Sequence, residues 1–151
     1  MLDPDTIRER FSQHGIRCTK QREDIYAVLH TSCEHPTAEE LYRDVRIHQP
    51  GLSLATVYNT LEIFTKRGLC RRLGNAAPGA GAGSACRYDA NLHEHTHLLT
   101  TDGQVRDVPE HLTRLVLDHI PLDVVRQIEQ EMGVVVERLS VDFIAKEGNR
   151  E

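Results

Sequence analysis

The chain has 151 residues, of which 27% are charged and 39% hydrophobic, a composition typical of a globular protein of one or two small domains. No apolar run approaches the roughly 20 residues that cross a bilayer, and the acidic N-terminus lacks an apolar signal segment. These features argue against a membrane protein, a fibrous protein and a secreted disulfide scaffold, and we expect a cytoplasmic protein.

The formal net charge of −5 is unevenly distributed along the chain. Residues 1–73 contain 11 Lys and Arg against 10 Asp and Glu, whereas residues 74–151 contain 7 against 13. A nucleic-acid partner would therefore meet the first half, where the local field is less negative.

The four cysteines, at 18, 33, 70 and 86, form no Cys-x-x-Cys motif. We expect free, buried or incidental thiols in a reducing compartment. A redox pair between Cys70 and Cys86 is the alternative, because both flank a predicted hairpin.

The first 68 residues have the periodicity of four amphipathic helices. Thr19, Thr37 and Ser53 each precede an apolar stripe and can act as N-caps. Thr37 and Glu40 together form a capping-box pattern. The expected helices cover residues 6–14, 19–30, 37 to before Pro50, and 53–67.

Two short extended segments follow, at 69–73 and 86–90, and the Gly- and Ala-rich stretch 74–85 between them is expected to be a flexible hairpin tip. Helices followed by a two-stranded hairpin are the order of a winged helix-turn-helix. We therefore predict a winged-helix DNA-binding domain at residues 1–90, with 74–85 as the wing tip.

Residues 91–151 are predicted to form a small α/β domain, which makes the chain α+β overall. The pattern indicates a hairpin of 95–100 with 104–108, helices that begin at Pro109 and Pro121, and an extended stretch from 134 to 144. About 60 residues make a thin core, so we infer a homodimer. The apolar positions expected to face inward are Leu112, Leu115, Val116, Leu122, Val125, Ile128 and Met132.

Three histidines alternate in the sequence, at His93, His95 and His97, just before and within the predicted strand 95–100. In a strand this spacing places all three on one face. Asp89 precedes them and Asp107 lies across the predicted turn, and mixed nitrogen and oxygen ligands suit Zn²⁺, Fe²⁺ or Mn²⁺. The alternative is a solvated polar strand that holds no ion.

The helix at 53–67 presents polar side chains near its N-terminal end: Thr56, Tyr58, Asn59 and Thr60. Such side chains can reach base edges in a major groove. An ordinary amphipathic helix would show the same pattern.

Three segments, 15–22 (GIRCTKQR), 35–42 (HPTAEELY) and 53–61 (SLATVYNTL), closely resemble the ferric uptake regulator (Fur) family. The match continues in order through 87–89, the histidine run and 103–107, so that it spans about residues 5–145. The resemblance implies a homodimeric, metal-activated repressor that binds double-stranded operator DNA at an inverted repeat.

The resemblance also implies site residues. It assigns the regulatory metal to His35 and Asp89 from the DNA-binding domain and to His95, His97 and Asp107 from the dimerisation domain, with His93 and Glu94 as lesser candidates. It places Tyr58 on a base-contacting tyrosine and Arg17 near a basic segment that contacts the DNA backbone.

The chain departs from the common family pattern at its cysteines and at a second metal site. The two Cys-x-x-Cys pairs that hold a structural zinc are missing, so we expect no such zinc. Thr96 and Met132 replace residues of a further metal site. These departures resemble the peroxide-responsive (PerR) and Irr branches, which implies an iron or peroxide sensor. A zinc- or manganese-responsive regulator is the alternative, and a cupin-like metal enzyme, which also uses His-x-His on a strand, is a rival of another class.

Overall fold

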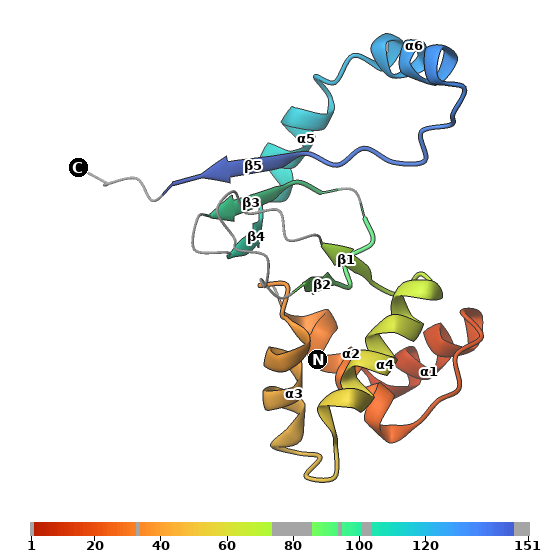
Figure 1. Ribbon diagram of the computed structural model, residues 1–151, viewed down its shortest axis with the longest axis vertical. Coiled ribbons are helices and arrows are strands. Elements are labelled where there is room, and N and C mark those ends of the chain that lie inside the picture. Colours follow the sequence, from red (N-terminus) through yellow and green to blue (C-terminus); the bar gives the residue numbers. More distant parts are fainter. Residues whose placement is uncertain (1, 33, 74–85, 94, 101–103, 147–151) are drawn as a thin grey trace.

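The computed structural model describes residues 2–32, 34–73, 86–93, 95–100 and 104–146. Four helices form one half of the molecule, and a three-stranded sheet with two further helices forms the other, with a two-stranded hairpin between them (Figure 1). The elements are α1 (Pro4–Gln13), α2 (Lys20–Thr31), α3 (Ala38–Arg46), α4 (Leu54–Lys66), β1 (Arg71–Leu73), β2 (Arg87–Asp89), β3 (His97–Thr100), β4 (Val105–Asp107), α5 (Glu110–Leu117), α6 (Leu122–Met132) and β5 (Asp142–Ala145).

The helices of the first half begin where the sequence predicts. The side chains of Thr19, Thr37 and Ser53 each accept a hydrogen bond from a backbone N–H three residues further on. The capping box is complete, because the carboxylate of Glu40 also accepts from the backbone N–H of Thr37 at 2.8 Å. Gly68, with φ +72°, follows the end of α4.

The core of this half is built around three aromatic rings, those of Phe11, Tyr26 and Phe64, from three different helices. Their centroids lie 5.4 to 5.6 Å apart, and all three side chains are fully buried. Rings at this spacing add about 0.5–1.5 kcal/mol per pair to the burial of their area. The aromatic cluster therefore holds α1, α2 and α4 together.

Strands β1 and β2 pair antiparallel, with Arg71 opposite Asp89 and Leu73 opposite Arg87. This register places Cys70 and Cys86 at opposite ends of the ladder, so the alternative of a redox pair between them is wrong. Cys70 and Cys18 are free thiols. The predicted wing tip at 74–85 lies outside the described residues.

The sheet of the second half has the order β4-β3-β5, with β3 antiparallel to β4 and parallel to β5. His97 pairs with Asp107 on one side and with Asp142 on the other. The strand begins at His97 rather than at His95, and the predicted strand 134–144 is realised only at Asp142–Ala145.

Helices α5 and α6 form as predicted, but most of their expected inward residues are not buried. Leu112, Leu115 and Met132 are 44%, 57% and 71% exposed, whereas the buried side chain of α5 is that of Thr113. The reason is that no other element among the described residues covers these apolar faces, and Figure 1 shows α6 apart from the sheet. No helix in the described part of the chain is long and apolar enough to span a membrane.

Candidate metal centre

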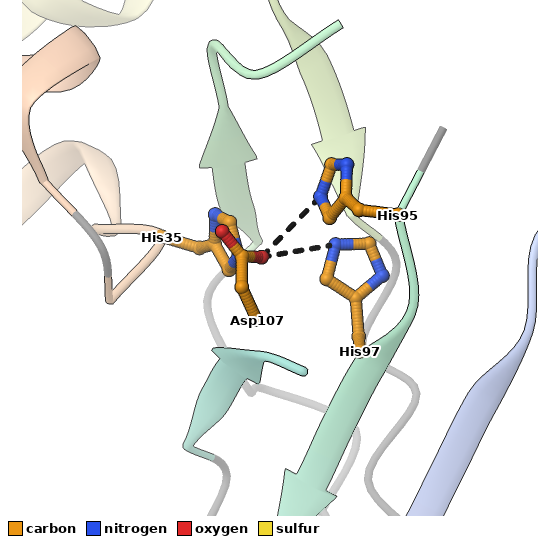
Figure 2. Close-up of side chains that lie close together, drawn as sticks. All are labelled: His35, His95, His97 and Asp107. Carbon is orange, nitrogen blue, oxygen red and sulfur yellow. Dashed lines mark hydrogen bonds and ion pairs between the residues drawn. The ribbon is translucent and has the colours of Figure 1, made fainter. Parts of the chain in front are cut away.

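Four side chains from distant parts of the sequence converge on one point, where each offers a ligand atom within 4.8 Å of the others: His35, His95, His97 and Asp107 (Figure 2). The Oδ1 atom of Asp107 lies at the centre of the group. It is 2.6 Å from Nε2 of His35, 3.3 Å from Nε2 of His95 and 3.8 Å from Nε2 of His97. Ligands that share one Zn²⁺ at about 2.0–2.2 Å lie at most about 4.4 Å apart, so the four donors need to move only slightly.

Asp89 lies against the same group, at the end of β2. Its Oδ2 atom is 3.1 Å from Nε2 of His95 and 4.0 Å from Nε2 of His97, and its Oδ1 atom is 3.6 Å from Nδ1 of His35. The five residues thus come from three places: the loop before α3, the end of β2, and the β3–β4 hairpin with the residues just before it.

The other ring nitrogen of two of these histidines is already engaged, which orients the imidazole. Nδ1 of His95 is 2.8 Å from the backbone oxygen of His93, and Nδ1 of His97 is 3.3 Å from Oδ1 of Asp142. An Nδ1–H that donates to such an acceptor leaves the lone pair on Nε2, which faces the centre. Metal-binding histidines commonly have this arrangement.

Buried polar atoms without hydrogen-bond partners are concentrated at this point. Among the described residues, four buried side-chain atoms have no hydrogen-bond partner at a good angle: Nε2 of His95, Nε2 of His97, Oδ2 of Asp89 and one oxygen of Glu39. Nε2 of His95 and Oδ2 of Asp89 are within ion-pair distance of each other, but their lone pairs and N–H groups are not aligned. Burying polar atoms without partners is costly, so such atoms need an explanation. Three of the four point into the same space, and imidazole and carboxylate donors suit a borderline divalent cation, so the residues present fit a metal ion.

The charges and the burial of the group shift the pKa values of His95 and His97 in opposite directions. The nearby carboxylates of Asp107 and Asp89 raise the pKa of His95 to about 10. Burial, followed by the charges of His95 and His35, lowers the pKa of His97. Burial alone would raise the pKa of Asp107, but hydrogen bonding and attraction to His35 and His95 hold it well below its usual value.

His35 carries a backbone feature that sequence reasoning did not detect. Its φ is +46°, a region that non-glycine residues rarely adopt, and its side chain is only 2% exposed. It also precedes Pro36, which restricts the backbone further. Backbone strain of this kind clusters at functional sites, where the surrounding structure enforces it.

The remaining metal candidates are not part of the group. His93 is exposed, and it contributes its backbone oxygen, not its ring, to the hydrogen bond with His95. The expectation that His93, His95 and His97 share one strand face fails because the strand begins only at His97. Glu94 lies outside the described residues.

The candidate DNA-contacting residues of α4 separate into two sets. Tyr58 is 43% exposed, and its hydroxyl donates to Oε1 of Glu39 on α3 at 2.5 Å. Asn59 is exposed, and Thr56 is half-buried with its hydroxyl 2.8 Å from that of Ser53. Thr60 is 3% exposed and faces the core, so its predicted role in DNA contact is wrong.

Arg17, the remaining DNA candidate, is exposed in the segment before α2, where its backbone oxygen accepts from Arg22 at 2.8 Å. Asp142 and Glu39 are partners that the sequence reasoning missed. No motif marks either residue, because their contacts depend on how separate elements pack.

Similar proteins were found by sequence and by structure. The profile of the ferric uptake regulator family matches residues 13–132. The peroxide-responsive repressor PerR of Staphylococcus epidermidis is 32% identical over 141 residues, which cover 91% of this chain and 84% of that protein. PerR of Staphylococcus aureus strain Mu50 is 38% identical over 87 residues, 58% of this chain and 55% of that protein.

Among solved structures, a zinc-bound manganese uptake regulator superposes with a TM-score of 0.64 at 25% identity, over 95% of this chain and 99% of that one. The peroxide stress regulator of Campylobacter jejuni has the same fold, with a TM-score of 0.64 at 23% identity and 99% of both chains covered. The predicted α+β fold class is thereby confirmed. Because the family profile matches residues 13–132, most of this chain, the chain belongs to the ferric uptake regulator family.

Proposed function

We propose that the protein is a metal-responsive repressor of transcription. The observation that carries this proposal is the composite origin of the candidate centre. His35 and Asp89 belong to the helical half and its hairpin, whereas His95, His97 and Asp107 belong to the second half. An ion held by both sets of ligands binds best when the halves are brought together, so its binding shifts the population toward that arrangement.

The proposed ligands are His35, Asp89, His95, His97 and Asp107. The bound group is a divalent cation, Fe²⁺, Mn²⁺ or Zn²⁺, whose positive charge would balance the two carboxylates in this buried site. His93 is a weaker candidate, because its ring is not among the converging donors. We propose no structural zinc held by four cysteines, because the chain has four cysteines with none three residues apart.

The proposed arrangement has a winged-helix domain at residues 1–90 and a metal-binding dimerisation domain at 91–151. Two chains would join through the exposed apolar side chains of α5, α6 and β5. In such a dimer, closing the two halves of each chain sets the spacing of the two α4 helices. Operators of helix-turn-helix dimers are inverted repeats with half-sites about one helical turn apart.

The proposed DNA surface comprises Arg17, Thr56, Tyr58 and Asn59. Arg17 would contact phosphates, and the side chains of α4 would reach base edges in the major groove. A cytoplasmic location agrees with this role.

The physiological signal we propose is peroxide or iron, because a relative that covers 91% of the chain is a peroxide-responsive repressor. Regulation by zinc or manganese is the second candidate, which the likeness to a zinc-bound manganese uptake regulator favours. An enzymatic role has less support, because a cupin needs a many-stranded barrel and the described residues place β3 in a three-stranded sheet.

A DNA-binding titration tests the proposal. An operator selected from random DNA is titrated with the full chain in the presence of Mn²⁺, Fe²⁺ without oxygen, Zn²⁺ or a chelator, and binding is followed by fluorescence anisotropy. We expect tight binding only with metal. The mass of the complex, measured by sedimentation, is expected to correspond to two chains per operator. Equal affinity with metal and with chelator would refute the metal-responsive function.

The same sample identifies the signal. Peroxide added to the iron-loaded protein, followed by mass spectrometry of the histidine peptides, is expected to show oxidation at the centre and loss of DNA affinity. An iron-loaded protein that stays unmodified and bound would instead favour iron as the signal, and operator binding that requires Zn²⁺ or Mn²⁺ and fails with Fe²⁺ would favour a zinc or manganese regulator.

A further inference from the structure

Arg87, on β2, contacts the backbone on both sides of His35. Its Nη1 atom donates to the backbone oxygen of His35 at 3.0 Å and lies 3.3 Å from the backbone oxygen of Glu34. The side chain is 14% exposed, so these bonds are largely shielded from water. The two carbonyl groups precede and follow the α-carbon of His35, so one guanidinium restrains the peptide units on either side of it.

The restrained residue is the one with the unusual backbone. His35 has φ +46° and precedes Pro36. Such a conformation persists only where surrounding contacts enforce it. With this backbone, Nε2 of His35 reaches Oδ1 of Asp107, 72 residues further along the chain, at 2.6 Å.

The same guanidinium also fixes the start of α3. Nη1 of Arg87 lies 3.2 Å from Oε2 of Glu40, and this oxygen accepts the backbone N–H of Thr37 in the capping box. The neighbouring backbone adds to this attachment, since Thr37 pairs with Arg87 as an isolated bridge and Tyr88 N–H donates to the oxygen of Pro36 at 3.0 Å. The loop that carries His35 is therefore held against β2, the strand that ends in Asp89.

We propose that Arg87 is a positioning residue for the metal centre. It holds His35 in its strained backbone conformation and keeps the side chain of His35 beside that of Asp89. This inference rests on the proposed metal site. All of these contacts are made by Nη1, which the planar guanidinium holds in a fixed orientation, whereas a lysine ammonium rotates on a flexible stem, so the two are not equivalent here.

Zinc affinity of the full chain tests the assignment, measured by competition with a chelating dye. Arg87→Gln is expected to weaken zinc binding about 10–100-fold, the usual effect of losing a residue that orients a metal ligand. Arg87→Lys is expected to lose less. The matched control is Arg43→Gln, which removes the same charge from an exposed position of α3.

A second measurement needs no metal. In the metal-free protein, the amide proton of Tyr88 is expected to exchange with solvent faster in Arg87→Gln than in the unaltered chain, because the loop of Pro36 is released. Arg43→Gln is expected to leave that exchange rate unchanged.

The assignment is overturned if Arg87→Gln binds zinc within twofold of the unaltered chain, or if Arg43→Gln loses as much. Should Arg87→Gln fail to fold by circular dichroism, Glu40→Gln takes its place. That variant retains a capping side chain at this position but loses the ion pair with Arg87. An unaltered chain that binds no zinc, iron or manganese would instead refute the proposed function.

Discussion

His97 and Asp142 face each other on neighbouring parallel strands, with Nδ1 of the histidine 3.3 Å from Oδ1 of the aspartate. The pair joins the candidate metal centre to β5, the last strand of the described chain. It also fixes the ring so that Nε2 of His97 is directed toward Asp107. A histidine oriented by a carboxylate in this way is a better metal ligand, because the imidazole is held in one tautomer.

Replacing Asp142 is therefore expected to weaken metal binding although the residue is not among the proposed ligands. Asp142→Ala should lower zinc or manganese affinity about 10–100-fold, as measured by chelator competition. Glu137→Ala, which removes an exposed carboxylate outside the sheet, serves as the control. Equal affinities of Asp142→Ala and the unaltered chain would show that the hydrogen bond has no influence on the ligand.

The metal and DNA functions are expected to separate between His95 and Tyr58. His95→Ala removes a proposed ligand, so metal affinity should fall and metal-dependent operator binding with it. Tyr58→Phe removes only the hydroxyl that donates to Glu39. It should weaken operator binding at saturating metal several-fold and leave metal affinity unchanged. Isothermal titration with metal and anisotropy with DNA distinguish the two, and a loss of metal affinity in Tyr58→Phe would contradict this division.

Metal binding is expected to release a proton near neutral pH. The carboxylates of Asp107 and Asp89 raise the pKa of His95 to about 10, so its imidazole is protonated in the metal-free protein. An incoming cation must displace this proton before Nε2 can bind it. Calorimetric titrations in buffers of different ionisation enthalpy should show about one proton released per ion at about pH 7.5. Binding with no proton release would contradict a charged His95.

The same shift sets the pH dependence of stability in the metal-free protein. The folded pKa of His95 lies above its ordinary value of 6.5, so the pairing stabilises the fold fully below about pH 6.5 and is lost as pH rises toward 10. Urea denaturation of the metal-free chain should show this decline. His95→Asn, which cannot titrate, should lose less stability over the same interval.

The helical half could be predicted from sequence more completely than the site. Thr19, Thr37 and Ser53 mark helix starts through local hydrogen bonds, and such signals depend only on neighbouring residues. The pairing of His97 with Asp107 was also predictable, because a short hairpin brings its two strands together. His35 was reached only through resemblance to a family, since its position beside Asp107 depends on packing between segments 72 residues apart.

The errors have equally local causes. The residue type of Thr60 suits a base contact, yet the helical period places it beside Val57 and Leu61, facing the core. The sequence pattern places the apolar residues of α5 and α6 inside the fold. In the single chain, most of these side chains are exposed. A sequence pattern identifies an apolar face, but it does not say whether that face packs within the chain or against a second copy.

The exposed apolar faces lead to a prediction about assembly. Leu115 is 57% exposed on α5, and we expect it to lie in the dimer interface. Leu115→Asp should convert the dimer to a monomer and abolish tight operator binding, because a buried unpaired charge is strongly destabilising. Sedimentation equilibrium measures the mass, and Arg114→Asp, at an exposed neighbouring position, is the control. A Leu115→Asp chain that remains a dimer would place the interface elsewhere.

A pair of buried hydroxyl groups occupies the position at which the sequence predicts loss of a second metal site. Oγ1 of Thr96 lies 2.9 Å from Oγ1 of Thr113, and the two residues are 0% and 3% exposed. Thr113 also donates to the backbone oxygen of Val108 at 3.2 Å, so the pair ties the start of α5 to the residue before β3. Thr96→Val should cost about 0.5–1.5 kcal/mol of unfolding free energy, the net contribution of one hydrogen bond, because the hydroxyl of Thr113 keeps its bond to Val108. The double change Thr96→Val with Thr113→Val should cost less than the sum of the single changes, as measured by urea denaturation.

Metal analysis of the unaltered chain should give one ion per chain, since the hydroxyl groups of Thr96 and Thr113, bonded to each other, offer a cation no charged donor. A second tightly bound ion that is lost in Thr96→Val would show instead that these hydroxyl groups belong to a metal site.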